Sequence, residues 1–282
     1  MTIRDFLRSL SAMNFPRNEA RLLIAHVLHR DQAWLIAHDD YEFAAGELNA
    51  LSTLTDRRTA GEPIAYLLGQ REFYGRAFRC SPAALIPRPE TELLIDYALN
   101  LIPVGSAAMG GTADTPMHIL DVGTGTGCIA ITLALERPGI AVTAIDISPD
   151  ALALAKDNAQ RLRTNVTFVH SDWFAALPTH AQFDLILSNP PYIVPGDAHL
   201  TQGDLRFEPA IALADALDGL ESYRRLALGA QRHLKSGGML IVEHGYDQGE
   251  SVPALLSAVG FKDIATHRDL ADHPRVTVAR KR

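Results

Sequence analysis

The sequence predicts an α/β protein whose mostly parallel sheet is covered by helices on both faces. From residue 117 onward, short apolar runs alternate with amphipathic stretches, which is typical of parallel strands joined by helical crossovers. A glycine-rich loop follows the first run, and an Asn-Pro-Pro-Tyr segment ends the fourth. We expect parallel strands at 117–122, 141–146, 166–169, 183–188 and 238–243, helices near 127–136, 149–161 and 219–234, and a final strand from Arg275, antiparallel at one side of the sheet.

The first 70 residues have a different pattern and predict a small all-α region. Apolar residues recur there at helical spacing, and Pro16, Gly46 and Gly61 divide the pattern into short helices. Such a bundle serves either as a stabilising cap or as a docking module for a protein partner. The residues themselves favour neither role.

Two short segments connect these regions and interrupt the second one. Residues 71–86 predict a β-hairpin, because aromatic residues flank Gly75 and Arg76. Residues 103–116 are rich in glycine, alanine and threonine, which predicts a flexible surface loop.

The segment 87–92, Pro-Arg-Pro-Glu-Thr-Glu, predicts the start of a helix. Proline and acidic residues are favoured in a first helical turn, and an apolar run follows them here. Arg88, Glu90 and Thr91 either cap this helix or brace a functional site, and of the two we favour capping.

The composition is that of an ordinary globular protein. Of 282 residues, 47% are hydrophobic and 21% charged, and the net charge of −7 argues against gripping nucleic acid through its phosphates. Cys80 and Cys128 lie outside any CxxC pair and the histidines form no ligand cluster, so we expect neither a disulfide nor a metal. The sequence shows no signal peptide and no long apolar run, which predicts a cytoplasmic protein without a membrane span.

The glycine loop at 123–127 is expected to bind a nucleotide-like ligand. Glycines let the backbone approach a ligand, and the N-terminus of the following helix attracts an anion. Asp146 ends the next strand, where an acid hydrogen-bonds ribose hydroxyls. NAD enzymes use G-x-G-x-x-G, but Cys128 occupies the third glycine position here, so the G-x-G-x-G spacing favours S-adenosylmethionine (SAM).

Two residues after the third strand complete the predicted cofactor site. Asp172 can accept a hydrogen bond from an adenine amine, and Trp173 can cover the face of the ring. Phe174 is more typical of core packing. The expected cofactor-binding residues are Gly123, Thr124, Gly125, Thr126, Gly127, Asp146, Asp172, Trp173 and Asn189.

The Asn-Pro-Pro-Tyr segment predicts a second binding position, for a planar group that carries an NH2. The two prolines cannot continue the buried strand, so Asn189 lies at its carboxyl end, the edge where open α/β sheets bind ligands. The segment presents one amide, one aromatic ring and carbonyls without matching donors. Its expected ligand is therefore a carboxamide or a nucleobase amine, bound by Asn189, Pro190, Pro191 and Tyr192.

The chain closely resembles the HemK/PrmC family of protein-glutamine methyltransferases, which modify peptide chain release factors. The Asn-Pro-Pro-Tyr motif is shared with amino-methyltransferases that act on DNA, whereas segment 86–92 and the helical N-terminal region are particular to the release-factor enzymes. The matching segments span most of the chain: 61–66, 71–75, 86–92, 121–127, 146–150, 171–174, 188–193, 206–209, 243–250 and 268–270.

This resemblance implies a class I SAM-dependent methyltransferase fold, Rossmann-like, with a mostly parallel seven-stranded sheet. It divides the chain into a substrate-docking domain at 1–70, a hairpin linker at 71–86 and a methyltransferase domain at 87–282. It implies methylation of the side-chain amide of the glutamine in the Gly-Gly-Gln motif of class I release factors, with S-adenosylhomocysteine as the other product. We expect a monomer that uses no metal, DNA or membrane.

For that reaction we expect Asn189, Pro190 and Tyr192 to act directly on the substrate. The Asn189 side-chain oxygen and the Pro190 carbonyl would accept the two N–H bonds of the glutamine amide, and Tyr192 would pack against its flat face. An adenine-N6 DNA methyltransferase is an alternative, but it calls for a basic and aromatic target-recognition segment that the sequence lacks. A non-catalytic SAM-binding module of translation is a third, but it has no need of the Asn-Pro-Pro-Tyr pocket.

Overall fold

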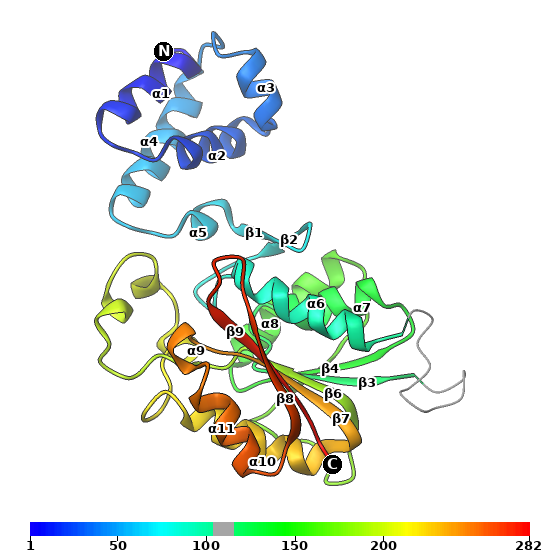
Figure 1. Cartoon of the computed structure of the whole chain (residues 1–282). Coiled ribbons are helices and arrows are strands. Elements are labelled where there is room, and N and C mark those ends of the chain that lie inside the picture. Colours follow the sequence, from blue (N-terminus) through cyan, green and yellow to red (C-terminus); the bar gives the residue numbers. More distant parts are fainter. Residues whose placement is uncertain (104–115) are drawn as a thin grey trace. The chain divides into compact units, whose positions relative to one another are not determined.

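The computed structural model describes residues 1–103 and 116–282, so the loop predicted at 103–116 lies almost entirely outside the described residues. The described chain forms two compact units, Met1–Gln70 and Arg71–Arg282 (Figure 1). The first unit is helical, and the second is built around a large sheet.

The first unit is an all-α bundle around its own core. Its helices are α1 (Ile3–Ala12), α2 (Arg17–Leu28), α3 (Gln32–Ala37), α4 (Ala45–Thr59) and α5 (Ile64–Leu68). Fully buried Ile3, Leu23 and Leu51 come from three different helices and hold these together. The unit therefore carries a hydrophobic core of its own.

The helix breaks predicted at Pro16 and Gly61 are confirmed, whereas the break predicted at Gly46 is wrong. Pro16 and Gly61 lie between helices, whereas Gly46 lies in the first turn of α4. That helix starts where the Glu47 side chain accepts a hydrogen bond from Ala44 N (2.8 Å). A glycine is tolerated there because the first turn donates no hydrogen bonds within the helix.

The predicted hairpin pairs β1 (Gln70–Phe73) with β2 (Arg76–Arg79), and all of it except Gln70 belongs to the second unit. The turn consists of Tyr74 and Gly75, one residue earlier than predicted, with φ values of +52° and +73°. Positive φ at both central residues matches the right-handed twist of a two-residue hairpin. Phe73 and Phe78 are buried and meet edge to face at 6.0 Å, which anchors the hairpin in the core of this unit.

The seven-stranded sheet confirms the predicted fold class. Its order is β5-β4-β3-β6-β7-β9-β8. All neighbours from β5 to β7 are parallel, and β9 is antiparallel to both β7 and β8. The strands are β3 (His118–Val122), β4 (Ala141–Asp146), β5 (Thr167–His170), β6 (Phe183–Ser188), β7 (Leu234–Glu243), β8 (Lys262–Arg268) and β9 (Pro274–Arg280).

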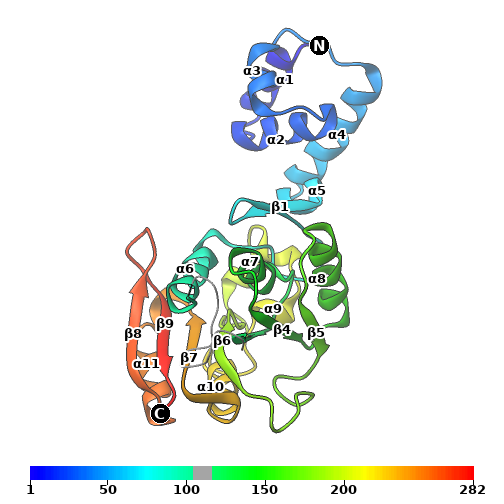
Figure 2. The same ribbon diagram turned by 90° about the vertical axis from the view of Figure 1, so that its right-hand side faces the viewer.

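Helices cover both faces of the sheet, as Figures 1 and 2 show. The β6 residues Leu185 and Leu187 join a core with α6 and α7, whereas Ile186 joins a core with α10 and α11. Such two-sided burial explains why β6 is a continuous apolar run. The larger helices are α6 (Glu92–Leu101), α7 (Cys128–Glu136), α8 (Pro149–Arg161), α10 (Glu221–His233) and α11 (Ser251–Ala258). Shorter ones are η1 (Pro89–Thr91), η2 (Ala198–Thr201), η3 (Leu205–Phe207), α9 (Ala210–Leu213) and η4 (Tyr246–Gln248).

The final strand is antiparallel, as expected, but it is not the edge of the sheet. The edge strand on this side is β8, which the sequence pattern did not predict, and β9 lies between it and β7. Most β8 side chains are exposed or half-buried. An exposed edge strand needs no apolar run, so its sequence resembles that of a loop.

The strand order reverses direction between β3 and β6. The crossovers from β3 lead one way to β4 and β5, and β6 pairs with the opposite side of β3. Val122 lies opposite Ser188, so the glycine loop and Asn189 leave the sheet side by side. Such a switch point opens a crevice at the carboxyl ends of the strands.

Asn158 on α8 stabilises the glycine loop that borders this crevice. Its side chain is fully buried, accepts from Arg79 N (2.8 Å), and donates to Arg79 O (3.2 Å) and Thr126 O (3.0 Å). It thereby ties the hairpin to the glycine loop.

We expect Asn158→Ala to lower the free energy of unfolding by about 2–3 kcal/mol, because buried backbone groups lose their partners. Urea unfolding measures this change. The matched control is Gln160→Ala, an exposed position on the same helix. Equal stability of the two variants would contradict the assigned role.

Candidate active site

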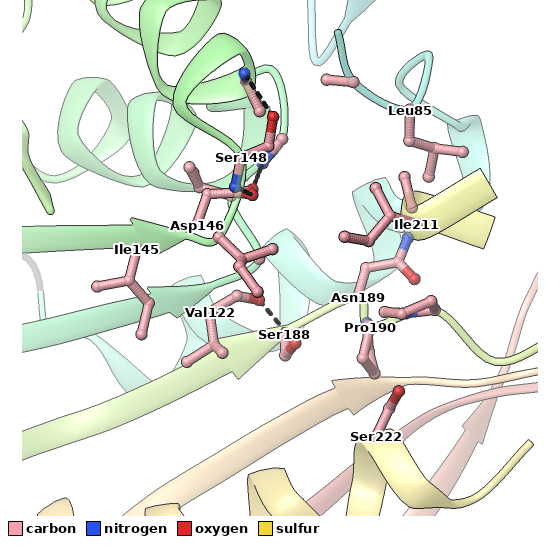
Figure 3. A pocket seen from close by; sticks show the side chains of 18 of the residues that line it. Leu85, Val122, Ile145, Asp146, Ser148, Ser188, Asn189, Pro190, Ile211 and Ser222 are labelled. Carbon is pink, nitrogen blue, oxygen red and sulfur yellow. Dashed lines mark hydrogen bonds between the residues drawn. The ribbon is translucent and has the colours of Figure 1, made fainter. Parts of the chain in front are cut away.

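A cavity of about 410 Å³ opens at the carboxyl ends of β3, β4 and β6 (Figure 3). Its volume lies within the range of small-molecule sites. The walls come from the glycine loop, the β4 and β5 ends, the start of the Asn-Pro-Pro-Tyr segment, a strip before η1, α9 and the start of α10. Predicted site residues that line it are Gly123, Thr124, Gly125, Thr126, Asp146, Asp172, Trp173, Asn189, Pro190 and Pro191.

Three glycines of the loop, Gly123, Gly125 and Gly127, have a left-handed backbone. Gly123 and Gly127 need to be glycine for different reasons. A Cβ added to Gly123 (φ +74°) would have no atom within 4 Å, so the backbone of this residue is open on that side. At Gly127 (φ +82°) a Cβ would lie 2.8 Å from Ile131 Cδ1 and 3.1 Å from Ala155 Cβ. Gly127 does not line the cavity, and its glycine is required because α7 packs closely on α8.

Asp121, the penultimate residue of β3, is fully buried and stabilises the glycine loop through hydrogen bonds. Its Oδ2 accepts from Thr124 Oγ1 (2.6 Å) and from Ala130 N (3.3 Å), while Oδ1 has no partner among the described residues. Burial raises the pKa of this carboxyl to about 7. Asp121 was not predicted as a site residue, although an acid two residues before the first glycine of the loop was visible in the sequence.

Asp146 ends β4 beside the loop. Its Oδ2 accepts from Gly125 N and its Oδ1 from Ser148 N, each at 2.9 Å. Burial raises its pKa, and these backbone N–H groups oppose that rise. The carboxylate is therefore held rigidly at the cavity wall with lone pairs left for hydroxyl groups.

The β5 end places Asp172 and Trp173 together at the cavity. Asp172 is exposed, and Trp173 has a left-handed backbone (φ +49°), which is uncommon for an aromatic residue. Ser171 maintains this turn by donating to Trp173 O (2.6 Å) and accepting from Ala176 N (3.0 Å). Phe174 instead stacks on His233 at 5.4 Å, which is core packing, as expected.

Asn189 lies directly after β6 and faces the same cavity as Asp146 (Figure 3). Its Nδ2 donates to Thr91 Oγ1 at 3.1 Å, which turns Oδ1 away from Thr91. Ser188, the last residue of β6, donates to Val122 O (2.7 Å) and so ties the end of β6 to β3.

The capping role favoured for Arg88, Glu90 and Thr91 is wrong for Arg88 and Thr91, neither of which makes a side-chain cap hydrogen bond. Thr91 makes no side-chain hydrogen bond to the start of α6 and instead accepts from Asn189. Arg88 pairs with the buried Glu208, which also accepts from Ile86 N (2.9 Å). Arg88 and Thr91 therefore brace the cavity, because their side chains find partners there rather than at the helix end. The role of the exposed Glu90 stays a prediction.

Tyr192 does not line the cavity. Its ring packs against the core on the α10 and α11 face, and burial raises its pKa to about 12. Its backbone oxygen accepts from Gln248 Nε2 at 3.4 Å. The predicted contact between this ring and a substrate therefore stays a prediction.

Two other features concern metals and membranes. The described residues contain no group of three or more His, Cys, Asp or Glu side chains that could hold a metal ion. Within the same residues, no helix is long and apolar enough to cross a membrane.

Two family models match the chain. A model described as "Methyltransferase domain" matches residues 113–269, and one described as "PrmC N-terminal domain" matches residues 2–69. Among solved structures, a methyltransferase from Pyrococcus furiosus has a TM-score of 0.53 at 17% identity, covering 82% of this chain and 98% of its own. A T. thermophilus 16S rRNA methyltransferase in complex with AdoMet and guanosine has a TM-score of 0.52 at 20% identity, covering 76% and 50%. These structures support the fold alone.

The similarity to whole proteins is higher. A release factor glutamine methyltransferase from Bordetella pertussis is 48% identical over 268 residues, which cover 95% of this chain and 96% of its own. The enzyme of the same name from Escherichia coli is 42% identical over 279 residues, covering 99% and 97%. The chain therefore belongs to the release factor glutamine methyltransferase family.

Proposed function

We propose that this chain transfers a methyl group from SAM to the side-chain amide nitrogen of the glutamine in the Gly-Gly-Gln motif of class I release factors. The observation that carries the proposal is the Asn189 amide at the cavity: its nitrogen donates to Thr91, and its oxygen has no hydrogen-bond partner among the described residues. Family membership over nearly the whole chain supports the release factor as the acceptor.

The residues at the glycine loop fit SAM. The open backbone at Gly123 would take the methionine end, and Asp146 would bind the ribose hydroxyls. Asp172 would accept from the adenine amine, with Trp173 against the ring. Bound SAM supplies a methyl group on an electron-poor sulfonium, and this chain need only aim a nucleophile at it.

Asn189 and Pro190 would orient the nucleophilic nitrogen toward the methyl group. Asn189 Oδ1 and the Pro190 carbonyl are acceptors, so together they hold the two N–H bonds of a primary amide and point the nitrogen at the methyl group. They also stabilise the positive charge that grows on nitrogen during transfer. A strong base is not required, because methylation itself makes the nitrogen acidic and its proton can pass to water.

The same two acceptors would select glutamine over glutamate. A carboxylate has no N–H to donate, so its oxygens would face the two acceptor oxygens without a hydrogen bond to either. An adenine amine would satisfy both acceptors, so the pocket alone does not exclude DNA. The match of residues 2–69 to an N-terminal domain of this family favours a protein acceptor, and we propose that this domain docks it. The cytoplasmic location and the monomeric state stay predictions.

We expect labelled methyl from SAM to appear in a class I release factor and not in duplex DNA. Replacing the glutamine of its Gly-Gly-Gln motif with alanine should abolish the label, because the acceptor nitrogen is gone. Filter-bound radioactivity and mass spectrometry of the motif peptide measure this. Label in DNA would support the adenine enzyme, and label in neither acceptor would support a non-catalytic SAM binder.

Asn189→Ala should reduce kcat by about 10²–10³-fold, because one of two acceptors on the nitrogen is lost. Single-turnover methylation of the release factor measures this, and calorimetry reports SAM binding separately. Asn100→Ala, at an exposed position on α6, is the matched control. Near-normal turnover of Asn189→Ala with intact SAM binding would refute the arrangement.

Asp146→Asn should weaken SAM binding by about 10–100-fold, because hydrogen bonds to a charged carboxylate contribute about 1.5–3 kcal/mol. Calorimetry measures the dissociation constant. Asp150→Asn is the control, since Asp150 is an exposed acid in the first turn of α8, the helix that follows β4. If both variants bound SAM equally well, Asp146 would not hold the ribose.

A further inference from the structure

Ile211 is an exposed apolar side chain that lines the cavity. It lies on α9 and is 59% exposed, although it borders the same cavity as Asn189. Among the described residues it belongs to none of the three apolar cores, so folding makes little use of it. An exposed isoleucine is ordinary on a protein surface, but one that borders a binding cavity offers apolar contact to whatever enters.

Hydrogen bonds fix α9 at both of its ends. Before the helix, the buried Glu208 accepts from Ile86 N (2.9 Å) in the strip that precedes η1. At its end, Leu213 O accepts from Ile193 N (3.1 Å), and Ile193 is the residue after the Asn-Pro-Pro-Tyr segment. The helix is therefore held between two walls of the cavity, which gives Ile211 a fixed place.

Ile211 lies at the acceptor end of the cavity. In Figure 3 it lies on the side of Asn189 and Pro190, whereas Asp146 and Ser148 lie on the other side. The proposed function assigns the glutamine amide to the first pair and the ribose of SAM to Asp146. A contact from Ile211 would therefore reach the acceptor rather than the donor.

A glutamine acceptor brings apolar atoms as well as an amide. Two methylene groups separate its amide from the main chain, and they form no hydrogen bonds. If Asn189 Oδ1 and the Pro190 carbonyl hold the amide, the methylene groups lie between these acceptors and the mouth of the cavity. They are stabilised there only by leaving water for an apolar surface.

We infer that Ile211 is a specificity-determining residue that packs against the methylene groups of the acceptor glutamine. This role rests on the proposed function and adds the residue that binds the aliphatic part of the substrate. The methylene groups do not change during methyl transfer, so the contact is equally strong in the ground state and the transition state. It therefore lowers KM for the release factor and leaves kcat unchanged.

The first test compares KM and kcat for methylation of the release factor. Ile211→Ala should raise KM about 10-fold, because most of the apolar contact is lost. Its kcat and its dissociation constant for SAM should stay within about threefold of the parent chain. Ile211→Leu keeps the apolar area, so its KM should also stay within about threefold. Leu217→Ala is the matched control, because Leu217 is 65% exposed, follows α9 and does not line the cavity.

The second test is a double-mutant cycle that locates the contact on the glutamine side chain. Calorimetry with S-adenosylhomocysteine present measures binding of the release factor without turnover. Ile211→Ala should weaken binding of the unchanged factor about 10-fold. It should change binding by less than about twofold when the motif glutamine is replaced by alanine, because that side chain ends at Cβ. Leu217→Ala should leave the binding of both factors within about twofold.

Three results would overturn this role while leaving the proposed function intact. Ile211→Ala might weaken both factors equally, which would place the contact elsewhere on the release factor; it might weaken neither; or it might weaken SAM binding instead, which would assign Ile211 to the donor. Circular dichroism and thermal unfolding establish that each variant is folded, and Ile211→Thr replaces Ile211→Ala if the latter is not. A parent chain that does not methylate the release factor at all would instead refute the proposed function.

Discussion

The site depends on the central position of β6 in the sheet. This strand pairs with β3 on one side and β7 on the other, and all of its residues are buried. Pairing and burial on both sides leave it one register, because a one-residue slip would exchange the residues of its two apolar faces. Its end is therefore fixed to the glycine loop after β3 and to Glu243 at the end of β7.

The sequence could predict the parts of this arrangement that are local in the chain. The β6 run and the two prolines that end it place Asn189 correctly, because a buried strand and a proline stop are both visible in consecutive residues. The loop at 123–127 and Asp146 are found in the same way. Ten of the predicted site residues accordingly line one cavity.

The parts that the sequence could not predict depend on contacts between distant segments. Thr91 and Asn189 are 98 positions apart, and nothing near Thr91 distinguishes a partner of Asn189 from a helix cap. Gly127 looks like its neighbouring glycines, but its role follows from the approach of α8 behind it. The edge strand β8 lacks an apolar run because half of its environment is solvent.

The buried acids at the strand ends share one electrostatic property, a carboxyl pKa raised by burial. Asp121, Asp146 and Glu243 all have pKa values raised by burial, so the protein without ligand holds three carboxyls that are costly to ionise. A cationic ligand in the cavity would offset part of that cost, and it would do so most for Asp146, which lines the wall.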